Sequence, residues 1–344
     1  MLKPYIALAL NRKDLSAEQA EAAMNIIMTG QATQAQIGAY LVALRMKGET
    51  VDEITGSARA MRANAVRVTV ARGDQPMFDT AGTGGDGTGT FNISTAAAFL
   101  VAGTGRKVAK HGNRAASSQC GSADVLAALG LYLDLAPELV GGAIEEIGIG
   151  FLFAPKFHPA MRYAIGPRKE IGSRTIFNLL GPLTNPAGAD VQVIGVYDPL
   201  LTEPLAHVLG ELGSRAAFVI HGAGGADELN TSGTNRISHL KDGAVRTFEL
   251  DPASLGFAPG AVSELRGGTA DENAAVMRSL LAGQINGARR SAVVLNAAAA
   301  IAADSGDLPA AVAEAEQALV SGAALAKLEA LIGYSQRFAP KEQG

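Results

Sequence analysis

Strand-like and helix-like segments alternate along most of this chain after residue 65, and this alternation constrains the fold more than any other feature. Residues 77–82, 106–112 and 215–222 are expected to be short strands, whereas residues 94–103 and 201–213 have the pattern of helices. Strands that alternate with helices favour a mainly parallel sheet with helices on both faces. The sequence therefore predicts an α/β protein.

The remaining strand-like segments extend this pattern. Further strands are expected at residues 66–70, 149–155 and 190–199. Residues 237–250 have the pattern of a hairpin that turns at residues 241–243, where an Asp-Gly pair stands. We therefore expect a sheet that is mainly parallel and carries a hairpin toward its end.

The first 65 or so residues lack the strand pattern and are expected to be helical. Three of their helices begin with a Ser or Thr that is followed three residues later by Gln or Glu, at Ser16, Thr33 and Thr50. This capping box satisfies backbone amides that a helix leaves unpaired at its start. The chain from about Thr269 onward is rich in alanine and is also expected to be helical.

Composition narrows the classes of function. The net charge of −4 lacks the basic excess of a general nucleic-acid binder. The single cysteine, Cys120, allows no intrachain disulfide and fits a reducing cytoplasm. We read no signal peptide at the N-terminus, and the apolar runs are too short or too rich in alanine for a membrane span. We expect a cytoplasmic protein that binds neither nucleic acid nor membrane.

The stretch DTAGTGGDGTGTFN, residues 79–92, places five glycines between an expected strand and an expected helix. Its G-x-G-x-x-G spacing suits a dinucleotide, but residues 88–122 contain no Asp or Glu to hold the ribose. A P-loop would need Gly-Lys-Ser/Thr where Thr88-Gly89 follows Gly87. A purely structural turn would explain one or two glycines. The favoured interpretation is a phosphate cradle at a helix N-terminus, where glycines bring backbone N–H groups close to an anion.

A second turn after a strand, residues 110–124, supports this interpretation. Its cationic and hydrogen-bonding side chains are Lys110, His111, Asn113, Arg114, Ser117, Ser118 and Ser122. Turns that follow adjacent parallel strands open into one crevice at the carboxyl edge of the sheet. A diphosphate and a further phosphate would fit there, although His111 alone could equally be a structural histidine.

Adjacent acids, Asp227 and Glu228, stand in a third glycine-rich turn, after the strand expected at 215–222. Such pairs are usually solvated, but this turn also faces the carboxyl edge. A diphosphate is commonly bound together with Mg²⁺, which prefers carboxylate and water oxygens as ligands. Asp86 of the glycine-rich stretch is expected to order its loop by accepting backbone hydrogen bonds.

The segment from His158 to Gly188 interrupts the alternation with four prolines and is expected to run between two domains, where ligands often bind. Residues 156–174, which overlap its start, carry five basic side chains against one acid. Most of these could lie on a solvated helix face, but an arginine there could pair with a planar carboxylate in a forked geometry.

Four motifs together resemble the anthranilate phosphoribosyltransferase family: GTGGDGTGTFNIST, KHGNRAASSQCGSADVLAALG, HPAMRYAIGPRKEIGSRTIFNLLGPLTNP and HGAGGADEL. The resemblance spans most of the chain. It implies a homodimer whose subunit has a small helical domain (residues 1–68, joined by about 165–187) and a large α/β domain (69–164 and 188–344). It also implies transfer of the phosphoribosyl group from 5-phosphoribosyl 1-diphosphate to anthranilate with release of diphosphate, the second step of tryptophan biosynthesis from chorismate.

The resemblance further implies particular site residues. Those around the diphosphate and its metal would be Gly82, Thr83, Gly84, Gly85, Asp86, Thr90, Asn92, Ser94 and Thr95. Lys110 and Ser122 would hold phosphoribosyl groups, and Asn113 and Arg168 would face anthranilate, with His111 close by. Mg²⁺, expected as two ions per monomer, would be bound by Ser94, Asp227 and Glu228.

This chemistry agrees with the rest of the sequence. An aromatic amine is already neutral at pH 7, so the main demands are positioning and charge neutralisation at the leaving diphosphate. No convincing Ser–His–Asp or Cys–His set is present, and Cys120 is expected to be structural. Two alternatives remain: a pyrimidine nucleoside phosphorylase, against which the acid pair counts, and a nucleic-acid-binding relative without enzymatic activity, against which the negative charge counts.

Overall fold

The computed structural model describes residues 1–115 and 119–340, and its centre is a seven-stranded sheet with the order β3-β2-β1-β4-β5-β6-β7. The five parallel strands are β1 (Met77–Gly82), β2 (Lys107–Gly112), β3 (Ile149–Phe153), β4 (Val191–Gly195) and β5 (Ala216–His221). The antiparallel pair β6 (Asn235–Lys241) and β7 (Ala244–Leu250) completes one edge. The predicted α/β fold is confirmed.

The hairpin between β6 and β7 turns where the sequence predicts. Lys241 pairs with Ala244, and Asp242 and Gly243 between them have φ angles of 50° and 76°. Positive φ at both loop residues is the geometry of a type I′ turn, whose twist matches that of paired strands. The Asp-Gly pair therefore fixes the register of this edge.

Helices cover both faces of the sheet. One face packs against α5 (Ile93–Gly103) and α13 (Ala288–Ser305), and the other against α11 (Thr202–Glu211). Successive residues of β5 pack into different cores. Phe218 lies in the core shared with α13, and Val219 lies in the core shared with α11. Side chains of a strand alternate between its faces, so a strand buried on both sides reads as a continuous apolar run.

Further helices complete this part of the chain. They are α6 (Ser122–Ala128), α7 (Pro137–Ile147), α8 (Ala154–Phe157), α12 (Ala270–Leu281), α14 (Leu308–Val320) and α15 (Ala323–Gln336). Within the described residues, no single helix is long and apolar enough to cross a membrane, and only the pair α14 and α15, bent by 61°, passes that test together.

The expected strand at residues 66–70 is wrong. These residues form no strand and pair with no strand of the sheet. The amide of Val66 donates instead to the carbonyl of Phe157, and that of Val68 donates to the carbonyl of Pro186. The segment thus joins the N-terminal helices to the sheet beside the His158–Gly188 region, because its backbone partners are Pro186 and the residue just before His158.

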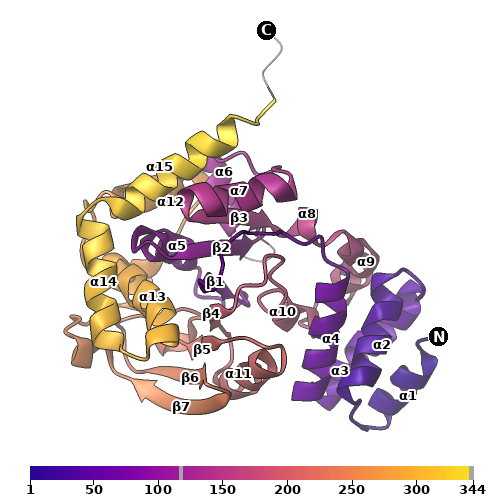
Figure 1. Cartoon of the computed structure of the whole chain (residues 1–344). Helices are drawn as coiled ribbons and strands as arrows, with labels where there is room; N and C mark the ends of the chain where they lie inside the picture. Colours follow the sequence, from indigo (N-terminus) through magenta and orange to yellow (C-terminus); the bar gives the residue numbers. More distant parts are fainter. Residues whose placement is uncertain (116–118, 341–344) are drawn as a thin grey trace.

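Four helices form an N-terminal bundle beside the sheet: α1 (Lys3–Leu10), α2 (Ala17–Met28), α3 (Gln34–Lys47) and α4 (Val51–Ala63) (Figure 1). All three predicted capping boxes are present. Two helices from the His158–Gly188 segment join the bundle: α9 (Arg162–Ile171) packs on α3, and α10 (Phe177–Leu180) packs on α4. How the chain divides into domains, residue by residue, stays a prediction.

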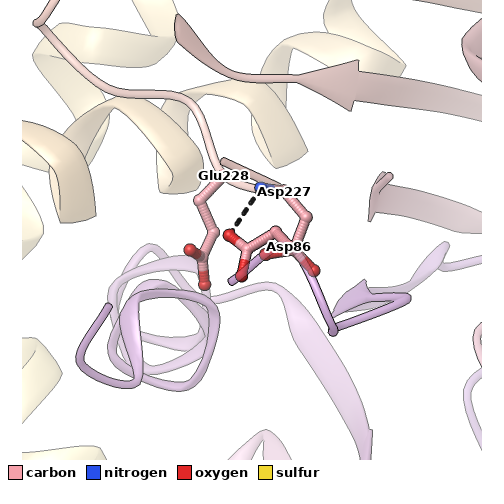
Figure 2. Close-up of side chains that lie close together, drawn as sticks. All are labelled: Asp86, Asp227 and Glu228. Carbon is pink, nitrogen blue, oxygen red and sulfur yellow. Dashed lines mark hydrogen bonds between the residues drawn. The ribbon is translucent and has the colours of Figure 1, made fainter. Parts of the chain in front are cut away.

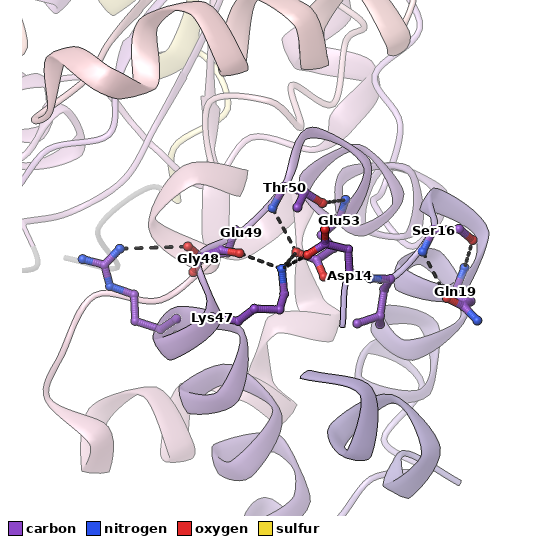
Figure 3. Close-up of polar contacts among 10 residues, drawn as sticks. Asp14, Ser16, Gln19, Lys47, Gly48, Glu49, Thr50 and Glu53 are labelled. Carbon is purple, nitrogen blue, oxygen red and sulfur yellow. Dashed lines mark hydrogen bonds and ion pairs between the residues drawn. The ribbon is translucent and has the colours of Figure 1, made fainter. Parts of the chain in front are cut away.

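The capping box of α4 also anchors the bundle (Figure 3). Glu53 is fully buried, and its carboxylate accepts hydrogen bonds from the amides of Thr50 and Leu15 at 2.9 and 3.0 Å. Lys47 Nζ lies 3.0 Å from Glu53 and 2.6 Å from Asp14. A buried carboxylate is tolerated here because every side of it is paired.

Candidate active site

A cavity of about 770 Å³ opens at the carboxyl ends of β1 and β2. All the predicted site residues on the glycine-rich stretch, on the turn after β2 and in the acid pair line it: Gly82, Thr83, Gly84, Gly85, Asp86, Thr90, Asn92, Ser94, Thr95, Lys110, His111, Asn113, Ser122, Asp227 and Glu228. The topology thus brings three turns that are distant in sequence into one crevice. Ser117 and Ser118 lie outside the described residues.

The glycine-rich stretch owes its path to left-handed backbone. The φ angles of Gly84, Gly85, Gly87 and Gly89 all lie between 65° and 80°, a region that residues other than glycine rarely adopt. Gly82 is needed for a different reason, since a Cβ there would lie 2.5 Å from a carboxylate oxygen of Asp227. The amide of Gly84 donates to the same oxygen at 2.8 Å. Glycine therefore lets the loop fold against the acid pair.

Three carboxylates meet on one side of the cavity: Asp86, Asp227 and Glu228 (Figure 2). Each offers an oxygen within 4.8 Å of the others. Burial, and then the charge of Asp86, raises the pKa of Asp227 to about 6, while burial and Asp227 raise the pKa of Glu228 well above its ordinary value. Clustered carboxylates fit a hard divalent cation such as Mg²⁺, whose charge would relieve their repulsion.

Asp86 has the loop-ordering contacts that its position suggested. One carboxylate oxygen accepts from the amide of Thr88, and the other accepts from the hydroxyl of Thr88 and from the amide of Asp227. It therefore ties the glycine-rich stretch to the acid pair. Asp86 also belongs to the carboxylate cluster.

Two glycines at strand ends make room for the acid pair. A Cβ on Gly195, the last residue of β4, would lie 1.6 Å from the carbonyl oxygen of Asp227. A Cβ on Gly222, just after β5, would lie 1.9 Å from the carbonyl oxygen of Glu228. The acid turn thus lies directly against the ends of two strands, and this contact fixes where its carboxylates stand.

Lys110 lines the cavity but is buried, and the carboxylate of Asp79 is buried near it. Its Nζ donates to the carbonyl of Thr80 at 2.6 Å and to that of His111 at 3.3 Å. Nearby, Asp79 accepts from the amide of His111 at 3.1 Å and from Asn185 Nδ2 at 2.8 Å. Burial raises the pKa of Asp79 to about 6, although the charge of Lys110 opposes that rise.

His111, which lines the cavity, packs against the buried His158, with ring centroids 5.1 Å apart. Burial lowers the pKa of both rings, that of His158 to about 4, so both are neutral near pH 7. Neither Nε2 atom has a hydrogen-bond partner among the described residues. His111 therefore lines the cavity as an uncharged group.

The turn after β2 is tied together locally. Ser122 Oγ donates to the carbonyl of Asn113 at 3.3 Å, and Arg114 pairs with Asp124 at 2.8 Å. Cys120 is buried, with its Sγ 3.5 Å from Asn92 Oδ1. Burial raises the pKa of the Cys120 thiol, which agrees with a structural role.

Two arginines of the His158–Gly188 segment lie outside the cavity lining. Arg168, predicted to face a substrate, lies on α9 with its guanidinium 5.2 Å from the centre of the Phe177 ring. Arg174 stacks on Tyr197 at 3.9 Å and donates to the carbonyl of Gly85. The structure therefore separates Arg168 from the other predicted site residues, whereas Arg174 contacts the glycine-rich stretch.

A fourth segment completes the cavity and was missed by sequence reasoning. It comprises residues 265–268, which lie beside the glycine-rich stretch, and Asn273 on α12. Asn273 Nδ2 donates to Asn92 Oδ1 at 3.1 Å. The sequence LRGG, just before the capping box of α12, combines a cation with two glycines and could have drawn attention to it.

Comparisons with known proteins agree with this architecture and site. Residues 3–65 match the model described as "Glycosyl transferase family, helical bundle domain", and residues 74–325 match "Glycosyl transferase family, a/b domain". A helical bundle with an α/β domain that carries a glycine-lined crevice thus defines the chain as a transferase of this class.

Individual relatives narrow the class. Anthranilate phosphoribosyltransferases of Moorella thermoacetica and Symbiobacterium thermophilum are 54% and 53% identical, over 98% of this chain in both cases and 100% and 98% of the relative. The crystal structure of the enzyme from Thermus thermophilus has a TM-score of 0.91 at 44% identity, covering 96% of this chain and 99% of that one. The enzyme from Saccharomyces cerevisiae in complex with PRPP and Mg has a TM-score of 0.89 at 28% identity, covering 98% of both chains. This chain belongs to the anthranilate phosphoribosyltransferase family.

Proposed function

We propose that this chain transfers the phosphoribosyl group of 5-phosphoribosyl 1-diphosphate to the amine of anthranilate, which gives N-(5-phosphoribosyl)anthranilate and diphosphate. This is the second step of tryptophan biosynthesis from chorismate. The observation that carries the proposal is the cavity in which a glycine-rich cradle faces three clustered carboxylates. A cradle for phosphates beside a site for divalent cations suits a metal-bound diphosphate leaving group.

The site residues receive the following roles in this proposal. Residues 82–86 with Thr90, Asn92, Ser94 and Thr95 surround the diphosphate, and Lys110 and Ser122 hold the phosphoribosyl group. Ser94, Asp227 and Glu228 bind Mg²⁺, with two ions per monomer. Bound Mg²⁺ would supply the positive charge that a departing diphosphate requires.

Asn113 and Arg168 are assigned to the acceptor. The Arg168 guanidinium packs against the aromatic ring of Phe177. A planar guanidinium of this kind can pair with the carboxylate of anthranilate in a forked geometry. Burial lowers the pKa of His111, so its neutral ring in the cavity wall is suited to positioning a substrate rather than to accepting a proton.

A homodimer is part of the proposal. Large apolar side chains are exposed on α1 and α3, namely Leu10 and Met46, and Val42 lies one turn before Met46. Exposed apolar side chains that gather on one face of a bundle suit a surface that a second copy of the chain would cover.

The fluorescence of anthranilate provides the test of the main proposal. The protein, 5-phosphoribosyl 1-diphosphate, Mg²⁺ and anthranilate are mixed, and the fluorescence should fall as the substrate is consumed. No change in the presence of Mg²⁺ would contradict the proposed function. Turnover of a pyrimidine nucleoside with inorganic phosphate under the same conditions would favour the phosphorylase alternative instead.

The metal role is tested by combining Asp227→Asn with Glu228→Gln. Loss of two carboxylates should lower turnover by at least about a hundredfold while the protein stays folded, because the charge on the leaving group is then poorly neutralised. Asp242→Asn in the exposed hairpin turn is the matched control and should leave turnover unchanged. Equal turnover in the double variant and the control would refute the metal role.

A further inference from the structure

Residues 265–268 are here called the strap, and residues 266–268 of it form a wall of the cavity that none of the predicted roles uses. The strap runs beside the glycine-rich stretch, to which it is joined by backbone hydrogen bonds. The amide of Phe91 donates to the carbonyl of Leu265 at 2.8 Å, and the amide of Gly267 donates to the carbonyl of Gly89 at 2.9 Å. Between these bonds, Arg266 forms an antiparallel bridge with Thr90.

Arg289 on α13 holds the strap from behind. Its guanidinium donates to the carbonyls of Glu264 and Arg266 at 3.0 and 2.8 Å, and it lies 5.7 Å from the centre of the Phe91 ring. The backbone of Arg266 is therefore fixed on both sides before any ligand arrives. A fixed backbone lowers the entropy that a side chain loses when it contacts a ligand.

The side chain of Arg266 differs from the other cationic side chains of the cavity in its hydrogen-bond partners. Lys110 is already engaged with two backbone carbonyls, and Arg114 is paired with Asp124. Arg266 lines the cavity, is exposed, and makes no side-chain hydrogen bond or ion pair with any described residue. Its positive charge is thus available to a ligand.

Arg266 also stands close to the carboxylate cluster. Its bridge partner Thr90 donates through its hydroxyl to Glu228 at 2.9 Å. An anion held near these carboxylates by a cation would therefore lie within reach of a long side chain that extends from this backbone position. Guanidinium groups bind phosphate oxygens through paired, charge-assisted hydrogen bonds.

We propose that Arg266 is a substrate-contacting residue whose guanidinium binds a phosphate oxygen of 5-phosphoribosyl 1-diphosphate. The inference rests on the proposed function for the identity of the substrate. It adds to that function a fourth wall of the site, which the strap presents and Arg289 holds in place. The oxygen belongs either to the diphosphate or to the phosphate on the ribose, and the two sources can be separated by experiment.

The test compares Arg266→Gln and Arg266→Lys with Arg246→Gln. Arg246 is an exposed arginine on β7, outside the cavity, so its variant is matched in chemistry and exposure. Titration calorimetry with inorganic diphosphate and Mg²⁺ gives binding directly, and steady-state kinetics give KM for each substrate. Thermal unfolding checks that all variants remain folded.

Arg266→Gln should raise KM for 5-phosphoribosyl 1-diphosphate about tenfold, as expected for a lost hydrogen bond to a charged group, and leave KM for anthranilate within about twofold. Arg266→Lys, which keeps the charge, should recover part of the loss. Weaker binding of inorganic diphosphate as well would assign the contact to the diphosphate, and unchanged binding of inorganic diphosphate would assign it to the phosphate on the ribose.

Affinities and KM values in Arg266→Gln that equal those of Arg246→Gln would overturn the inference, and so would a fall in kcat alone. The calorimetric measurement does not involve anthranilate. A wild-type protein that binds diphosphate through Arg266 but turns over no anthranilate would therefore contradict the proposed function and leave this inference standing.

Discussion

His158 and His111 have neutral imidazole rings that are buried at or beside the cavity, and the carboxylate of Asp79 is buried beside His111. Burial acts in opposite directions on the two kinds of group, because it disfavours whichever form is charged. It lowers the pKa of His158 to about 4 and raises that of Asp79 to about 6. The two groups therefore make opposite contributions to stability as pH changes.

For His158, the folded pKa of about 4 lies below the ordinary value of 6.5. Its contribution to the unfolding free energy is fully present above pH 6.5 and is lost as the pH falls toward 4, because the unfolded state then binds a proton that the folded state does not bind. Asp79 has the opposite sign: its raised pKa gives a contribution that is present below its ordinary pKa and lost as the pH rises through about 6.

We predict that His158→Gln reduces the loss of unfolding free energy between pH 7 and 4.5 by about 2 to 3 kcal/mol relative to wild type. Urea unfolding at the two pH values measures the difference, and the contribution of Asp79, which both proteins share, cancels in the comparison. His207→Gln on α11, which replaces an exposed histidine, is the control. An equal pH dependence in wild type and His158→Gln would contradict the assigned burial effect.

At the scale of elements, the ends of β4 and β5 decide where the acid pair lies. Both strands end in glycine or are followed by it, at Gly195 and Gly222, and both glycines contact the backbone of the acid turn. Strand ends at the carboxyl edge of a parallel sheet are rigid supports for ligand-binding loops. The precise placement of the carboxylates thus depends on two residues that carry no functional group.

Gly195→Ala should displace the acid turn, because its Cβ would otherwise lie 1.6 Å from the carbonyl oxygen of Asp227. We expect a loss of about 1–3 kcal/mol in unfolding free energy from overpacking and at least a tenfold weaker affinity for Mg²⁺. Gly333→Ala in α15, where a Cβ meets nothing within 4 Å, should change neither affinity nor stability unfavourably. Calorimetric titration with Mg²⁺ decides the matter, and wild-type affinity in Gly195→Ala would show that the turn adapts.

At the scale of the whole molecule, the N-terminal bundle is continuous with one face of the sheet. Buried side chains of α2 and α4 belong to the same apolar cluster as Ile194 of β4 and Val219 of β5. The opposite face of the sheet builds a separate core with α5 and α13. Outside this core, Leu10 of α1 and Val42 and Met46 of α3 are exposed apolar side chains.

Met46→Glu should split the proposed dimer, because a charge would have to be buried without a partner in the interface. Met46 is 70% exposed in the single chain. Leu200→Glu replaces a side chain that is 79% exposed just before α11 and serves as the control. Light scattering coupled to size exclusion should give a monomer for Met46→Glu and a dimer for wild type and control; a wild-type monomer would contradict the proposed dimer.

Sequence by itself determined the features that depend on neighbours along the chain. The capping boxes at Ser16, Thr33 and Thr50, the Asp-Gly hairpin turn and the glycines of the cradle follow from local backbone requirements, and the alternation of strands and helices follows from burial on two faces. The placement of the two donor-rich turns and of the acid turn at one sheet edge also followed, because parallel strands expose their carboxyl ends on the same side.

Only the tertiary structure decided contacts between segments that are far apart in sequence. Residues 66–70 have the composition of a strand, yet their amides find carbonyls near residues 157 and 186 instead of a sheet neighbour. Asp86 joins the acid pair across 141 residues, and the strap reaches the glycine-rich stretch from the C-terminal third of the chain. Such contacts depend on where the whole fold places each backbone group, and no local preference encodes that position.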